Sequence, residues 1–222
     1  GIAKTSFLIA QSYEELGQYN KATELRTDAI LYAESAGIPA RMMSVELLLL
    51  KIIQKDNIDE EYQKCNELIQ DSKAIKANLV LRRAYLAMLH IQIRRGKYSK
   101  IPDVYEKYKK VHNESDCRDD NAELSFSDTI LALSKKLQGD KNAPEIKELE
   151  KLAEKNEEGL NNFWQNYFLY QLLGSKKGKK FLKLSYDEIE ELQSNLKGNE
   201  LKSFSNTYYV KLISEEWEKI NN

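Results

Sequence analysis

This chain of 222 residues is 41% hydrophobic and carries 34 basic against 35 acidic residues, for a net charge of −1. That length can bury a sizeable core, and the near-neutral sum excludes a global electrostatic attraction to nucleic acid or to an anionic membrane. The chain contains only 3 prolines and 9 glycines, too few for the many turns of a long all-β protein.

Cysteine spacing and apolar run length exclude further classes. Cys65 and Cys117 have no CxxC spacing, which argues against a disulfide framework and a zinc site. No apolar run approaches the roughly 20 residues that span a bilayer. We therefore expect a cytoplasmic protein that holds no metal or cofactor and does not enter a membrane. Gly1 and Ile2 already lie in a helical pattern without a signal peptide, so we expect a fragment of a longer protein.

Helix caps and apolar residues at 3.6-residue spacing predict helices along the whole chain. In chain order they are expected over residues 2–16, 19–36, 39–55, 58–72, 75–95, 98–112, 121–138, 143–156, 159–173, 177–196 and 198–220. Pro39, Pro102 and Pro144 each fall in the first turn of a predicted helix, the position that tolerates proline. The polar stretch 113–121 is expected to form a surface loop.

The first two predicted helices carry small and aromatic residues at fixed spacing. Two alanines are expected where the two helices approach closely and a third where room is needed for the next hairpin. A glycine is expected where the first helix ends with a positive φ, and a tyrosine over the turn. The set is Ala10, Tyr13, Gly17, Tyr19, Ala22 and Ala29.

This pattern recurs with some erosion farther along the chain. The Gly-x-Tyr turn appears again at Gly96, and Asn57 is expected to take the left-handed turn conformation that glycine fills elsewhere. The helix-ending markers are spaced by 39, 40, 43 and 35 residues, at Gly17, Asp56, Gly96, Gly139 and Gly174.

Together these residues resemble the tetratricopeptide repeat (TPR) family, whose unit is a helical hairpin of about 34 residues. The resemblance implies an all-α fold, a right-handed α-α superhelix of about five TPR-like hairpins with a C-terminal closing helix. Such hairpins must stack to bury their apolar faces, so we expect a single domain over residues 1–222. The C-terminal segment is similar to the helix that closes TPR arrays of large bacterial signalling proteins, through Leu196, Leu201, Phe204, Val210 and Leu212.

The resemblance also implies that the first helix of each hairpin lines a concave groove. Arginine and aromatic side chains on concave surfaces often dominate binding energy. One anchor is therefore expected around Arg83 and a second around Trp164. The candidate partner-binding residues are Phe7, Gln11, Met43, Leu50, Arg83, Leu86, His90, Ile93, Trp164 and Phe168.

No catalytic constellation emerges from the motifs. The run Gly174–Lys180 (GSKKGKK) lacks the glycine spacing and the Gly-Lys-Ser/Thr ending of a phosphate loop, so a solvated loop between helices is expected. His90 and His112 have no Cys or His at ligand spacing, and Cys65 is expected to be an inert core residue. The paired acids are expected on solvated helix faces. We therefore do not expect an enzyme.

The expected function is a protein–protein interaction, sensor or scaffold module in a larger regulatory or signal-transduction protein, with a protein or peptide segment as the partner. Two alternatives stay open: a peptide-pheromone-type receptor domain, and a structural spacer that binds nothing. Nucleic acid is not expected, because helical repeats that read RNA use a recurring pair of polar residues, and none recurs here.

Overall fold

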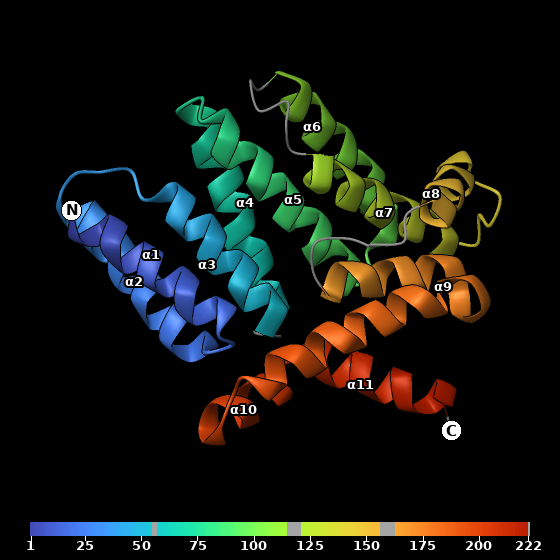
Figure 1. Ribbon diagram of the computed structural model, residues 1–222. Helices are drawn as coiled ribbons and strands as arrows, with labels where there is room; N and C mark the ends of the chain where they lie inside the picture. The colour runs from blue at the N-terminus through green and yellow to red at the C-terminus, as the bar shows by residue number, and fades with distance from the viewer. Residues whose placement is uncertain (55–56, 115–120, 156–162, 222) are drawn as a thin grey trace. The chain divides into compact units, whose positions relative to one another are not determined.

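The computed structural model describes residues 1–54, 57–114, 121–155 and 163–221. In these ranges all regular structure is helical and no strand occurs, so the prediction of an all-α fold is confirmed. The helices in Figure 1 are α1 (Ile2–Glu15), α2 (Tyr19–Ser35), α3 (Arg41–Gln54), α4 (Ile58–Ala74), α5 (Asn78–Arg94), the short 3-10 helix η1 (Tyr98–Lys100), α6 (Ile101–Glu114), α7 (Asn121–Leu137), α8 (Pro144–Lys155), α9 (Phe163–Ser194), α10 (Gly198–Ser205) and α11 (Tyr208–Asn221).

The chain packs into two compact units, each built from two separate stretches of sequence. Unit 1 comprises Gly1–Ile91 with Leu192–Lys211, and unit 2 comprises Gln92–Glu191 with Leu212–Asn222. In both units a C-terminal stretch returns to residues far earlier in the chain. The expectation of a single domain over 1–222 stays a prediction.

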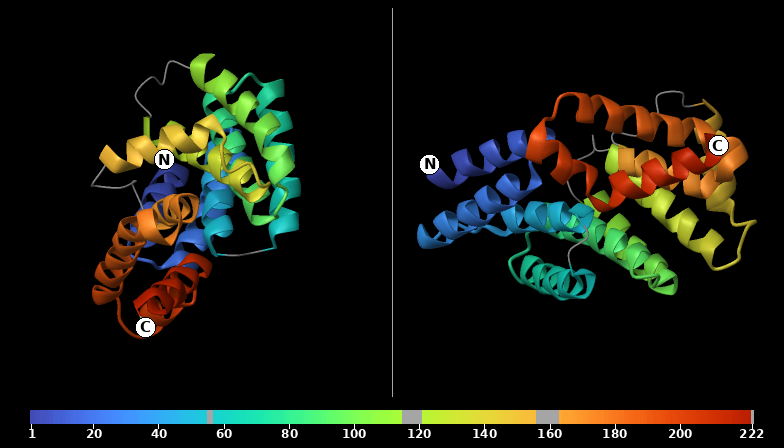
Figure 2. Two further views of the ribbon diagram at one scale, coloured as in Figure 1. Left: turned by 90° about the vertical axis from the view of Figure 1, so that its right-hand side faces the viewer. Right: turned by 90° about the horizontal axis from the view of Figure 1, so that it is seen from below.

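Small residues hold the first hairpin of unit 1 together. Helices α1 and α2 run side by side (Figures 1 and 2), and Ala10 and Ala22, predicted at their close approach, are fully buried. Ala29, predicted to make room for the next hairpin, is also fully buried. Arg26 is buried in the same hairpin, where it forms an ion pair with Glu14. The hairpin thus combines buried alanines with a partly buried ion pair.

Of the predicted helix-ending residues, Asp56 lies outside the described residues, and the four glycines behave as expected. Gly17, Gly96, Gly139 and Gly174 have φ of 68°, 67°, 95° and 76°, the left-handed range that glycine adopts without a Cβ penalty. The prediction for Asn57 was wrong: its φ is −62°, and its side chain accepts a hydrogen bond of 3.4 Å from the Glu60 backbone N–H. Asn57 is therefore the N-cap of α4.

Three local predictions need correction. Pro39 precedes α3, which begins at Arg41, although Pro102 and Pro144 do lie in first turns. The segment expected as a solvated loop is helical from Ser175 onward, because only Gly174 breaks α9. The predicted last helix is two helices, α10 and α11. Of the predicted loop 113–121, residues 113 and 114 belong to α6 and residue 121 starts α7, while residues 115–120, including Cys117, lie outside the described residues.

A segment near the C-terminus closes unit 1. Phe204 of α10 is fully buried, and its ring centroid lies 6.1 Å from that of Tyr19. A Cβ added at Gly17 would lie 3.0 Å from side-chain atoms of both Phe204 and Leu196. The turn of the first hairpin therefore packs directly against residues 179 and 187 positions later in the sequence.

In unit 2 a glycine brings the two halves of α9 together. The chain reverses at Gly174, and a Cβ on Gly178 would lie only 2.8 Å from the carbonyl oxygen of Tyr170. Helix α11 then packs on α9, where the Tyr170 hydroxyl donates to Glu216 at 2.7 Å and the rings of Tyr186 and Trp217 stack with centroids 5.4 Å apart. Gly178 is thus a packing residue rather than part of a loop.

Gly96→Val is expected to destabilise the protein by about 1–2 kcal/mol, because a β-branched residue is strained in the left-handed region. The cost is conformational rather than steric, since the nearest atom to a Cβ at Gly96 is the Tyr98 hydroxyl at 3.9 Å. Gly96→Asn is the matched control and is expected to lose much less, because asparagine tolerates this conformation. Urea unfolding of both variants is the measurement, and equal stabilities would contradict the assignment.

Candidate protein-binding site

None of the ten predicted groove residues is fully exposed; each is half-buried or buried. Five are half-buried: Phe7, Gln11, Met43, Arg83 and Trp164. The other five are buried: Leu50, Leu86, His90, Ile93 and Phe168. The expectation that these side chains line a partner-binding groove stays a prediction, and for the buried five it would require the covering residues to move aside.

The structure brings two groups of these residues together. In unit 1, Arg83 of α5 forms an ion pair with Glu46 of α3, so both helices do turn these faces toward each other. In unit 2, the ring of Phe126 makes an edge contact with Trp164 at 4.9 Å and a tilted contact with Phe168 at 5.8 Å. Both groups are occupied by contacts within the protein.

His90 shows what covers the predicted groove in unit 1. Its exposed fraction is 1%, and its Nε2 lies 2.6 Å from the Tyr209 hydroxyl at the start of α11. The two rings also stack with centroids 5.7 Å apart. The closing segment therefore supplies the contact that a bound partner was expected to make with His90.

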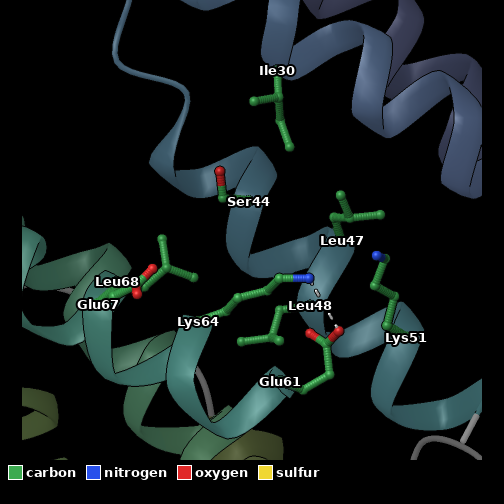
Figure 3. A pocket seen from close by; sticks show the side chains of 9 residues that line it. All are labelled: Ile30, Ser44, Leu47, Leu48, Lys51, Glu61, Lys64, Glu67 and Leu68. Carbon is green, nitrogen blue, oxygen red and sulfur yellow. Dashed lines mark ion pairs between the residues drawn. The ribbon is translucent and has the colours of Figure 1, made fainter. Parts of the chain in front are cut away.

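A different surface of unit 1 is hollowed. A pocket of about 260 Å³ lies where α2, α3 and α4 meet (Figure 3), and much of its wall is aliphatic. Ser44 helps to leave this space open, because its short side chain stands among larger neighbours and its hydroxyl donates to the Ala40 carbonyl at 3.2 Å. The residues that line the pocket are Ile30, Ser44, Leu47, Leu48, Lys51, Glu61, Lys64, Glu67 and Leu68.

Charged side chains stand around this aliphatic wall. The ammonium of Lys64 lies 2.7 Å from Glu60 and 3.5 Å from the buried Glu61, and the latter pair is the dashed line in Figure 3. The hydrogen bond to Glu60 raises the pKa of Lys64, and the same bond lowers the pKa of Glu60. Lys64 is therefore held as a cation by α4 itself.

Lys51 and Glu67 differ from that pair. Within the described part of the chain, neither forms an ion pair or a side-chain hydrogen bond. Figure 3 shows them on opposite sides of the pocket, with Leu47 and Leu48 between them. Lys51 does lie close enough to Glu60 to help lower the pKa of that carboxyl. The pocket thus offers an apolar wall with one positive group and one negative group at its edges, neither held in an ion pair by a described residue.

The pocket was not predicted from sequence, although one signal was present. Within the mostly apolar segment from Met42 to Leu50, Ser44 is the one small residue, and a small residue there leaves room beside α3. The neighbouring Cys65 is a core residue, as predicted: its thiol donates to the Ala84 carbonyl at 3.2 Å, and burial raises its pKa. That thiol is poorly suited to nucleophilic chemistry.

Unit 2 has a more polar hollow of about 290 Å³ between α6, α7 and α8. The Tyr105 hydroxyl donates to Asp128 at 2.6 Å, and Lys135 lies 2.5 Å from Glu145. Burial raises the pKa of Asp128, opposed by the bond from Tyr105. Because the wall of the unit 1 pocket is the more apolar of the two, we regard that pocket as the stronger candidate for an aliphatic ligand group.

Comparison with known proteins does not assign the chain. No family model matches it, and no curated protein matches it. In the described ranges, none of the helices is long and apolar enough to cross a membrane. No cluster of three or more His, Cys, Asp or Glu side chains that could hold a metal ion occurs in the same ranges.

Proposed function

We propose that this chain is a protein-interaction module that binds a peptide or helical segment of a partner, with an aliphatic side chain of that segment inserted in the pocket between α2, α3 and α4. The pocket is the observation that carries the proposal. Burial of one leucine-sized side chain contributes about 1.5–3 kcal/mol, and concave, mostly apolar sites are where such anchors bind.

The surroundings of the pocket support a binding role over catalysis. Its titratable groups are Lys51, Glu61, Lys64 and Glu67, and Lys64 is held in its charged form, so it is poorly suited to accept a proton. The buried thiol of Cys65 fits a reducing compartment, in line with the expected cytoplasmic location. As part of the same proposal, the chain is a TPR-like module of a larger regulatory or signal-transduction protein.

A spacer without a binding partner is the second candidate. It is favoured by the contacts of Phe204 with Tyr19 and of Tyr209 with His90, which make unit 1 self-contained. A spacer would not bind peptides through the pocket, so the effect of filling the pocket on peptide affinity distinguishes the two candidates.

Ser44→Phe is expected to weaken peptide binding at least tenfold without unfolding the protein, because the new ring fills the pocket from a half-buried position on α3. The probe is a displayed library of random 12-residue peptides selected on the wild-type protein. The affinity of enriched peptides for the variant is expected to fall at least tenfold, about 1.4 kcal/mol, as measured by fluorescence anisotropy.

Ser35→Phe is the matched control. Ser35 is also a helical serine whose hydroxyl donates to the carbonyl four residues earlier, at 2.8 Å to Leu31, but it is exposed and does not line the pocket. This control is expected to bind the peptides as the wild type does. Failure to enrich any peptide, or equal affinities for the Ser44→Phe variant and the wild type, would reject the proposed function.

A further inference from the structure

The charged residues Lys51 and Glu67 at the edges of the pocket restrict which segment can bind more than the aliphatic wall does. Lys51 lies on α3 and Glu67 on α4, and neither forms an ion pair with a described residue. The acid whose pKa Lys51 helps to lower, Glu60, is itself paired with Lys64 at 2.7 Å. Glu61, by contrast, has Lys64 within 3.5 Å. A ligand that enters the pocket therefore meets a net positive group at one edge and a net negative group at the other.

The pocket-lining segments of α3 and α4 have similar lengths. Ser44 and Lys51 are seven residues apart on α3, and Glu61 and Glu67 are six apart on α4. With a rise of 1.5 Å per residue, each lining segment spans about 10 Å. About 10 Å is also the length of two turns of a bound helix, so residues seven positions apart in a ligand helix span the same length as either lining segment.

We propose, resting on the proposed function, that the partner is an amphipathic helix with an aliphatic pair flanked by opposite charges, one turn before and one turn after. Its acidic residue pairs with Lys51, its basic residue pairs with Glu67, and its aliphatic side chains contact Leu47, Leu48 and Leu68. In such a helix, residues at positions 1, 4, 5 and 8 share one face.

Charge complementarity is what selects this occupant. A helix with two acids would leave one of them facing Glu67, and a helix with two bases would leave one facing Lys51. Like charges brought together at a partly desolvated rim oppose binding. An uncharged apolar helix would bury the wall but leave both edge charges without partners.

The test uses five synthetic helical peptides on one alanine- and glutamine-rich scaffold. Four carry Leu-Leu at positions 4 and 5, with Glu and Lys, two Glu, two Lys or two Gln at positions 1 and 8. The fifth carries Glu and Lys but replaces both leucines by Gln. Dissociation constants are measured by fluorescence anisotropy at low and at high salt.

For the wild type, the Glu/Lys peptide is expected to bind about three- to tenfold more tightly than the other leucine peptides, since partly exposed ion pairs contribute about 0.2–1 kcal/mol each. Salt should narrow this difference. Lys51→Glu should change the preference to the Lys/Lys peptide, and Glu67→Lys to the Glu/Glu peptide. The change of preference is a readout that loss of folding cannot produce.

The outcomes distinguish the two proposals. If all leucine peptides bind the wild type equally and neither variant changes the preference, the charged-helix inference is overturned while the pocket as an aliphatic site stands. If no peptide binds, or the peptide without leucines binds as well as its parent, the proposed function itself is overturned.

Discussion

Gly178→Val is expected to destabilise unit 2 by about 3 kcal/mol, at the upper end of what overpacking usually costs. The reason is steric: a Cβ at this position would lie 2.8 Å from the carbonyl oxygen and 2.9 Å from the Cα of Tyr170. These are backbone atoms, so no rotamer change relieves the contact. The two halves of α9 must move apart, and the stacking of α11 on α9 should weaken with them.

The measurement is urea unfolding, together with hydrogen exchange at α9 and α11 to locate the loss. Ser175→Val, at an exposed position of the same half-helix, is the control for the low helix propensity of valine. Gly178→Ala tests the sign of the effect. In an ordinary helix interior that change would stabilise by about 0.5–1 kcal/mol, whereas here it should destabilise. An alanine variant as stable as the wild type would refute the close contact.

Phe204→Ala is expected to destabilise unit 1 by about 3–5 kcal/mol, the usual cost of deleting a buried phenylalanine ring. The ring is fully buried and lies against Tyr19 and Gly17 at the turn of the first hairpin. Its removal leaves a cavity under that turn, so amides in α1 and α2 should lose exchange protection along with those of α10.

Leu201→Ala is the matched control on the same helix, because Leu201 is half-buried and should lose only about 1 kcal/mol. Hydrogen exchange that speeds up in α10 alone, with α1 and α2 unchanged, would show that the closing segment is not part of the unit 1 core.

Helix positions were largely predictable because helix formation depends on nearby residues. The 3.6-residue apolar spacing located the helices, and positive φ was correctly predicted at Gly17, Gly96, Gly139 and Gly174. The errors at Pro39 and Asn57 are also local. Each placed a helix start or a turn within a few residues of the right position, where several capping patterns compete.

The candidate site was not predictable in the same way. The groove residues were selected by projecting a repeat register, which assumes that nothing else covers the inner face. In unit 1, the Tyr209 hydroxyl lies 2.6 Å from His90 Nε2, and no sequence pattern near His90 predicts a contact with a residue 119 positions later. The pocket depends on the meeting of Ile30, Ser44 and Leu68 from three helices, which is equally non-local.

By itself, the sequence determined the all-α class, most helix boundaries, the glycine-ended turns and the alanine-lined first hairpin, because each follows from contacts within a few residues or one helical turn. Only the tertiary structure decided where the returning C-terminal segment packs, which inner-face residues it covers, and that Gly178 is a packing residue of α9. It also decided that the open hollow lies between α2, α3 and α4. Those features depend on contacts between residues far apart in sequence, and local propensity carries no information about which distant surfaces will meet.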